Sequence, residues 1–68
     1  MSFIETHNVA GMTCDHCARA VRIEVSAIDG VTDVDVDLDS GVVRVTAEQA
    51  VPITALRDAV EEAGYALV

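Results

Sequence analysis

A change of hydrophobic period along the chain limits the possible folds more than any other feature. Within the segment 31–38, Val34, Val36 and Leu38 alternate with aspartates, and after the turn sequence at 39–41 the alternation resumes with Val43 and Val45. This pattern is typical of two half-buried strands joined as a β-hairpin. Elsewhere apolar residues recur at helical spacing, first at Ala18, Val21, Val25 and Ile28 and later at Ile53, Leu56, Val60 and Ala63. The sequence therefore predicts a hairpin between two amphipathic helices.

The two ends of the chain complete this pattern with further strands. The predicted elements are a strand at 3–9, a helix at 15–28, strands at 31–38 and 42–47, a helix at 53–63 and a strand at 65–68. In the first strand, Glu5 and His7 share a side with Phe3 and Val9. Gly30 and Gly64 follow the helices, where a left-handed residue commonly ends a helix. We expect a single α+β domain spanning residues 1–68, in which two helices cover one face of a four-stranded antiparallel sheet.

The charge of the chain excludes one large class of partners. Twelve acidic residues against four arginines give a formal charge of −8, and the chain has no tryptophan. Nucleic-acid binding depends on clustered cations and aromatic platforms, so we expect no nucleic-acid partner. Cations, or a protein with a basic face, are the expected partners. An acidic surface also serves solubility alone, so the charge does not choose between these readings.

The location of the protein is predicted from two observations. The segment 1–9 has no basic stretch followed by an apolar run, and no segment approaches the roughly 20 apolar residues that span a bilayer. We therefore expect a cytoplasmic protein without direct membrane insertion. In a reducing compartment, two cysteines spaced three apart indicate a thiolate ligand pair or a redox pair, and a structural disulfide is disfavoured.

The motif GMTCDHC at residues 11–17 contains both cysteines of the chain and is its candidate functional site. If the helix begins near Asp15, Cys14 lies in the preceding loop and Cys17 in the first helical turn, so both sulfurs can converge on one point. Unpaired amides and the helix dipole there favour thiolates. Soft thiolates select soft ions, and a two-sulfur site suits Cu(I) best, because zinc normally takes four ligands. Zinc would need further donors, for which Asp15, His16 and His7 stay open candidates.

This motif, together with the predicted element order, resembles the heavy-metal-associated domain family and, within it, bacterial copper chaperones of the CopZ type. The resemblance implies a ferredoxin-like βαββαβ fold and Cu(I) held by Cys14 and Cys17. It implies delivery of copper to related domains of a copper-transporting P-type ATPase. It also implies that Met12 supports the loop from the core and that Tyr65, where eukaryotic relatives usually have lysine, lies close to the loop.

Several alternatives stay open beside the copper chaperone. Asp15 adds a hard donor that favours zinc or cadmium, although in zinc-exporting relatives the characteristic acid precedes the first cysteine, where this chain has Thr13. His16 is either a ligand or a solvated residue that tunes thiol acidity. A related mercury-binding protein, a metal-binding module of the ATPase and a copper-bridged homodimer are further readings. A dithiol redox enzyme is disfavoured, since proline is absent between the cysteines, and we expect no enzymatic activity.

Overall fold

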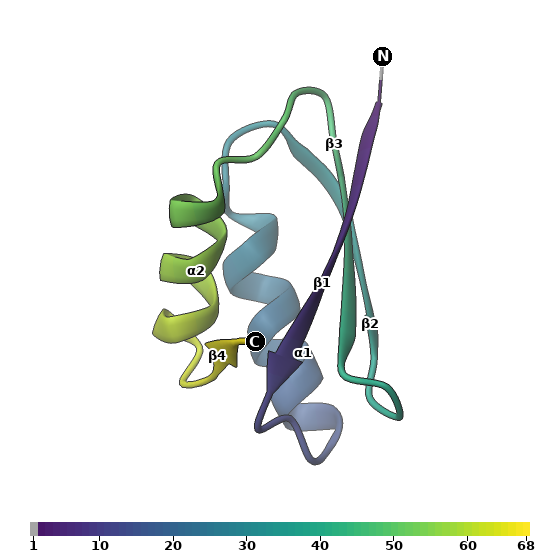
Figure 1. The fold of residues 1–68 in the computed structure, drawn as a ribbon, viewed down its shortest axis with the longest axis vertical. Helices are drawn as coiled ribbons and strands as arrows, with labels where there is room; N and C mark the ends of the chain where they lie inside the picture. Colours follow the sequence, from purple (N-terminus) through teal and green to yellow (C-terminus); the bar gives the residue numbers. More distant parts are fainter. Residues whose placement is uncertain (1) are drawn as a thin grey trace.

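The computed structural model describes residues 2–68 and has the predicted element order βαββαβ. The elements are β1 (Phe3–Ala10), α1 (Asp15–Ser26), β2 (Val31–Asp37), β3 (Val42–Ala47), α2 (Ile53–Glu62) and β4 (Ala66–Leu67). Both helices lie on one side of the sheet, so that the described chain has two layers (Figure 1). The expected ferredoxin-like α+β sandwich is confirmed. Neither helix of residues 2–68 has the length and hydropathy of a membrane-spanning segment.

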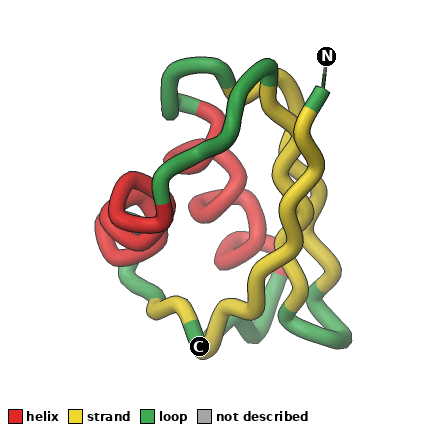
Figure 2. Tube along the Cα trace, turned by 45° about the horizontal axis from the view of Figure 1, so that its top comes forward, coloured by secondary structure: helices red, strands yellow, loops and turns green. Residues whose placement is uncertain are grey.

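The sheet is antiparallel throughout and has the strand order β2-β3-β1-β4. β1 pairs with β3 from Phe3 to Asn8 and with β4 at Val9 and Ala10. The last residues of β1 therefore pair with β4, the strand that follows α2. In Figure 2, β4 is the short yellow segment just before the C-terminus. This pairing brings the loop after β1 next to the end of α2, although the two are far apart in the sequence.

The core lies between the two helices and the sheet. Val21 and Val25 of α1 and Val60 of α2 are fully buried, in agreement with the helical spacing. The sheet contributes Val43 and Val45, each 1% exposed. No polar side chain in the described part of the chain is buried among them. Small aliphatic side chains therefore form nearly the whole interior, as the composition indicates.

Several predicted element boundaries were wrong by one to two residues: the ends of the first strand, of both helices and of the second strand, and both ends of the last strand. α1 ends at Ser26, before the predicted Ile28, since the N–H of Ala27 already bonds to Glu24 in a tighter turn. β2 ends at Asp37, before Leu38, because the backbone and side chain of Asp37 close the following turn by accepting the N–H groups of residues 41 and 39.

The last strand is also shorter than predicted because Tyr65 belongs to the cap of α2. The Tyr65 N–H donates to Val60 O at 3.1 Å and the Gly64 N–H to Glu61 O at 2.9 Å. With Gly64 at a φ of 96°, this is the Schellman arrangement at the end of a helix. The N–H of Tyr65 is therefore used by the helix, and strand pairing starts at Ala66.

An irregularity in β2 explains why Val31 does not follow the alternation of the later valines. Val31 pairs with Ala47 and Asp33 with Thr46, so Thr32 is left without a partner in the ladder. Such a bulge shifts the side-chain alternation by one residue. Val31 consequently packs against the core on the same side as Val34.

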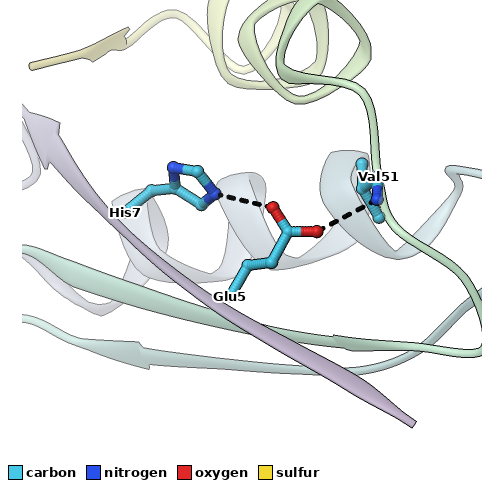
Figure 3. Close-up of polar contacts among 3 residues, drawn as sticks. All are labelled: Glu5, His7 and Val51. Atoms are coloured by element: carbon cyan, nitrogen blue, oxygen red, sulfur yellow. Dashed lines mark hydrogen bonds and ion pairs between the residues drawn. The ribbon is translucent and has the colours of Figure 1, made fainter. Parts of the chain in front are cut away.

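Two polar side chains of β1 face the helical layer, as Figure 3 shows. The Val51 N–H, in the segment leading into α2, donates to Glu5 Oε2 at 3.0 Å, and His7 Nε2 lies 3.4 Å from Glu5 Oε1. α2 has Pro52 as its N-cap and no side-chain capping bond. Glu5 thus ties the entrance of α2 to the sheet across 46 residues of sequence.

Replacing Glu5 with alanine is expected to lower the free energy of unfolding. The change leaves the Val51 N–H, in a residue only 7% exposed, without its partner. The expected loss is about 1–3 kcal/mol, the cost of an unsatisfied buried donor. Urea denaturation measures it, with Glu48→Ala as the control, because Glu48 is exposed and its side chain makes no hydrogen bond in residues 2–68. Equal effects of the two variants would contradict this role of Glu5.

Candidate metal centre

The loop between β1 and α1 places two thiols at the start of a helix. Cys14 is the N-cap of α1, in extended conformation, and its carbonyl accepts the N–H groups of Cys17 at 3.0 Å and Ala18 at 3.2 Å. No side chain caps this helix end. In Figure 1 the loop lies at the same end of the molecule as the β2–β3 turn and β4. The motif therefore projects from one end of the sandwich, away from the entrance of α2.

The two sulfurs lie close together at the protein surface. Cys14 Sγ is 3.4 Å from Cys17 Sγ, and both cysteines are free thiols. This distance is well beyond a disulfide bond of about 2 Å. Cys14 is exposed and Cys17 is half-buried. One sulfur is thus held by its surroundings while the other is fully open to an approaching molecule.

Hydrogen bonds to Cys17 stabilise its thiolate form. The pKa of Cys17 is lowered from 9.0 to about 6, chiefly by a hydrogen bond from the Thr13 backbone and then by the Tyr65 hydroxyl and the Cys14 side chain. The same contact raises the pKa of Tyr65, since its proton is needed for the bond to Cys17. These contacts therefore favour the thiolate of Cys17, the form in which cysteine binds metals.

Replacing Tyr65 with phenylalanine is expected to raise the pKa of Cys17 above its value of about 6. The variant keeps the ring and removes one of the donors that stabilise the thiolate. Because the folded pKa lies below 9.0, the metal-free protein gains stability as pH rises from about 6 to 9, and that gain disappears as pH falls through 6. The ultraviolet absorbance of the thiolate, followed against pH in metal-free protein, measures the shift. An unchanged titration in Tyr65→Phe would contradict the hydrogen bond.

The other predicted site residues surround the thiols at different distances. Met12 is half-buried and packs against the core beneath the loop. Thr13 Oγ1 lies 3.9 Å from Cys17 Sγ. Asp15 and His16 are exposed on the first turn of α1 and make no side-chain hydrogen bond or ion pair within residues 2–68. The structure thus brings Thr13 and Tyr65 to Cys17 and leaves Asp15 and His16 in solvent.

Further donors for a four-ligand zinc site do not gather around the thiols. His7 points into the helical layer and bonds to Glu5 (Figure 3). In the described range 2–68, no group of three or more histidine, cysteine, aspartate or glutamate side chains is placed to hold a metal ion. Structural zinc sites normally have four protein ligands. The donor set present is a pair of thiols.

Sequence reasoning missed the part played by Gly11. Gly11 has a φ of 94°, and a Cβ added there would be 3.2 Å from Tyr65 Cδ1. The signal in the sequence is a glycine that starts the cysteine loop, but its contact depends on the pairing of β1 with β4 and was not visible in the motif alone.

The fold and the loop together define a class: small ferredoxin-like domains with a Cys-x-x-Cys motif between the first strand and the first helix. The chain belongs to the heavy-metal-associated domain family, whose model matches residues 6–66. The predicted family is thereby confirmed.

Several proteins similar to this chain are described as copper chaperones or copper-binding domains. The chain is 43% identical over 65 residues to the copper chaperone CopZ of Staphylococcus aureus (strain JH9), covering 94% of this chain and 96% of the relative. Among solved structures, a CopZ metallochaperone is 42% identical with a TM-score of 0.89, covering 97% and 100% of the two chains. A copper binding domain from a P-type ATPase is 25% identical with a TM-score of 0.87, covering 100% and 92%. The resemblance to bacterial copper chaperones therefore extends over nearly the whole chain.

Proposed function

We propose that this chain is a copper chaperone that binds one Cu(I) ion through Cys14 and Cys17 and delivers it to a metal-binding domain of a copper-transporting P-type ATPase. The observation that carries the proposal is the pair of surface thiols 3.4 Å apart, one of them with a pKa of about 6. The similarity to the copper chaperone CopZ supports copper as the cargo. Copper is carried and passed on, so we propose no catalysed reaction.

The donor set favours Cu(I) over zinc. A closed-shell monovalent ion accepts two soft sulfur ligands, whereas zinc needs two more donors that residues 2–68 do not bring to the loop. If each metal–sulfur bond is about 2.3 Å, as for zinc thiolates, the sulfurs must move apart for the ion to lie on the line between them. Cys14 is exposed, so the movement we propose is that of its side chain toward solvent. Asp15 and His16 remain in solvent and have no part in the binding we propose.

Transfer follows from the openness of a two-sulfur site. An incoming partner thiolate forms a third copper–sulfur bond, after which one copper–sulfur bond to this chain breaks and that sulfur leaves as a thiolate. Each step exchanges one ligand, so the fold stays intact. The formal charge of −8 favours a partner surface with basic residues. Free thiols are typical of a reducing compartment, so we propose a cytoplasmic location. We also propose that residues 1–68 form a single domain.

A second candidate function is that of a copper-binding module within a P-type ATPase. The likeness to such a domain, with a TM-score of 0.87, favours it. The site and the exchange chemistry would be the same, and only the covalent context differs. A copper-bridged pair of these chains is a further state of the same site.

A transfer assay tests the proposed function. Chain loaded with one equivalent of Cu(I) is mixed with the metal-free copper-binding domain of a P-type ATPase, and the two are separated under anaerobic conditions. We expect copper to distribute between the two proteins within the mixing time. In the reverse experiment, we expect the copper-loaded ATPase domain to transfer copper to the metal-free chain. Retention of all copper on this chain would contradict the proposal, as would loss of copper to solvent before transfer. Loading with a single Cu(I) per two chains would identify the bridged pair.

A further inference from the structure

The sheet has one free edge that is long enough to take another strand. β2 and β4 are the outer strands of the order β2-β3-β1-β4, and β4 has only two residues. β2 has seven residues, and no strand within residues 2–68 pairs with its outer side. The unpaired N–H and C=O groups of such an edge are a template for an added strand.

The outward backbone groups of β2 belong to Val34 and Val36. The Val34 N–H donates to Asp33 Oδ1 at 3.0 Å, so it is directed away from the ladder with β3. Because hydrogen bonding alternates between residues in an antiparallel pair, Val36 points its N–H and C=O to the same outer side. Asp33 thus occupies the first outward N–H of this edge, and the N–H of Val36 is the next along the strand.

A hollow of about 550 Å³ adjoins this edge, between α1 and the last residues of β2. Arg19 and Arg22 line the hollow from α1, and Val36 lines it from β2. Both arginines are exposed, and neither forms an ion pair within residues 2–68. Two cationic side chains are therefore available to a molecule that lies in the hollow.

The two faces of the β2 edge have opposite charges. Val36 packs against the core, so its neighbours Asp35 and Asp37 point to the face of the sheet that no helix covers. Arg19 and Arg22 belong to α1, which lies on the other face (Figure 1). Side chains of an added strand alternate between the same two faces. One set of its side chains would meet the aspartates and the other set the arginines.

This charge pattern disfavours a second copy of the chain as the added strand. Antiparallel pairing of β2 with β2 of another copy would bring the aspartates of the two strands together on the uncovered face, where each strand has Asp33, Asp35 and Asp37. Like charges directly opposite one another in a sheet are destabilising. The strand that complements this edge has basic residues on one face and acidic residues on the other.

We propose that the outer edge of β2 and the adjoining hollow form a docking site for an extended segment of a partner protein in which acidic and basic residues alternate. The segment adds to the sheet as a fifth strand and exchanges backbone hydrogen bonds with Val36. Its acidic side chains reach Arg19 and Arg22, and its basic side chains reach the aspartates of β2. Charge complementarity on both faces selects this partner over a second copy.

The docking site lies beside the metal loop. Asp15, which directly follows Cys14, lines the hollow, whereas neither cysteine does. A docked segment therefore keeps its protein close to the thiols. The inference does not require copper, and its test uses metal-free protein. Its failure would leave the copper proposal standing, and failure of copper binding would leave the docking site standing.

Two peptides of identical composition test the docking site. Both have about eight residues, within the usual length of a strand. In the first, glutamate and lysine alternate strictly, and in the second all the glutamates precede the lysines. General attraction to the charge of −8 is the same for both, because their net charges are equal. Nuclear magnetic resonance titration should show saturable binding of the alternating peptide, roughly fivefold or more tighter than that of the block peptide.

Hydrogen exchange and arginine variants locate the bound peptide. Exchange of the Val36 N–H should slow when the alternating peptide saturates the protein, since that group becomes bonded. Arg19→Gln and Arg22→Gln should each weaken binding by roughly twofold to fivefold, the usual contribution of an exposed ion pair. Arg57→Gln is the matched control, because Arg57 is exposed on α2 and does not line the hollow. It should leave the affinity for the alternating peptide unchanged.

Four results would overturn the docking site: no saturable binding, equal affinity for the two peptides, equal effects of the three arginine variants, or unchanged exchange at Val36. Protection of the Val36 N–H that grows with protein concentration, without peptide, would also overturn it. That result would identify a second copy of the chain as the strand that covers this edge.

Discussion

Serine at either Cys14 or Cys17 is expected to abolish tight one-to-one binding of Cu(I). The two sulfurs, 3.4 Å apart, are the only thiols of the chain, and a hydroxyl is a hard, weakly acidic donor that Cu(I) does not prefer. We expect the affinity to fall by more than about a hundredfold, which exceeds the loss that accompanies removal of an outer-sphere partner of a metal ligand. Competition with a chromophoric Cu(I) chelator under anaerobic conditions measures the affinity.

The matched controls for the cysteine variants are two neighbours in the same motif. Asp15→Asn and His16→Asn remove side chains that are exposed and make no side-chain contact with the sulfurs in the described chain. Both should keep the affinity within a few-fold, since neither residue is a ligand in the proposed site. Full retention of one-to-one binding by both serine variants would refute the two-sulfur site. A large loss in His16→Asn would add histidine to the ligand set.

Truncation of Leu56 to alanine is expected to remove a large part of the free energy of unfolding. Leu56 is 1% exposed and is among the largest fully buried side chains in the described chain. Such truncations cost about 2–5 kcal/mol, because a cavity adds to the lost burial. At roughly 0.05–0.15 kcal/mol per residue, a chain of this length has a total stability of only about 3–10 kcal/mol.

The control for Leu56→Ala is an aliphatic residue of similar size on the surface. Ile23 lies in the middle of α1 and is 59% exposed, so Ile23→Ala should change stability by less than about 0.5 kcal/mol. Chemical denaturation followed by circular dichroism compares the variants. Added Cu(I) should raise the denaturation midpoint of Leu56→Ala, since a ligand that binds only the folded state stabilises it. A midpoint for Leu56→Ala equal to that of the parent would contradict the assigned core.

The fold was predictable because each element has its own local signal. Val43 and Val45 alternate in the hairpin, and Val21 and Val60 lie on helical stripes, so element type and buried face follow from spacing alone. The boundaries were less predictable, because they depend on hydrogen bonds between residues whose conformation is set by tertiary context. Tyr65 looked like part of a strand, yet its N–H completes the cap of α2.

The candidate site was predictable in its ligands and much less so in its surroundings. Cys14 and Cys17 stand three apart at a helix start, and this spacing alone brings the sulfurs together. The orientation of Tyr65 toward Cys17 and its contact with Gly11 depend on the pairing of β1 with β4, which joins residues more than fifty positions apart. Spacing along the chain contains no information on such a contact. The family resemblance supplied the proximity of Tyr65 to the loop, and the geometry adds the contact between Tyr65 and Gly11.

Direct competition between Cu(I) and Zn(II) for the reduced, metal-free chain tests the central claim. The measurement is an anaerobic titration with a chromophoric chelator that reports free Cu(I), repeated in the presence of excess Zn(II). The account predicts one tightly bound Cu(I) per chain, unaffected by zinc and lost on replacement of either Cys14 or Cys17. Displacement of Cu(I) by Zn(II), or a zinc complex with four protein donors, would contradict it.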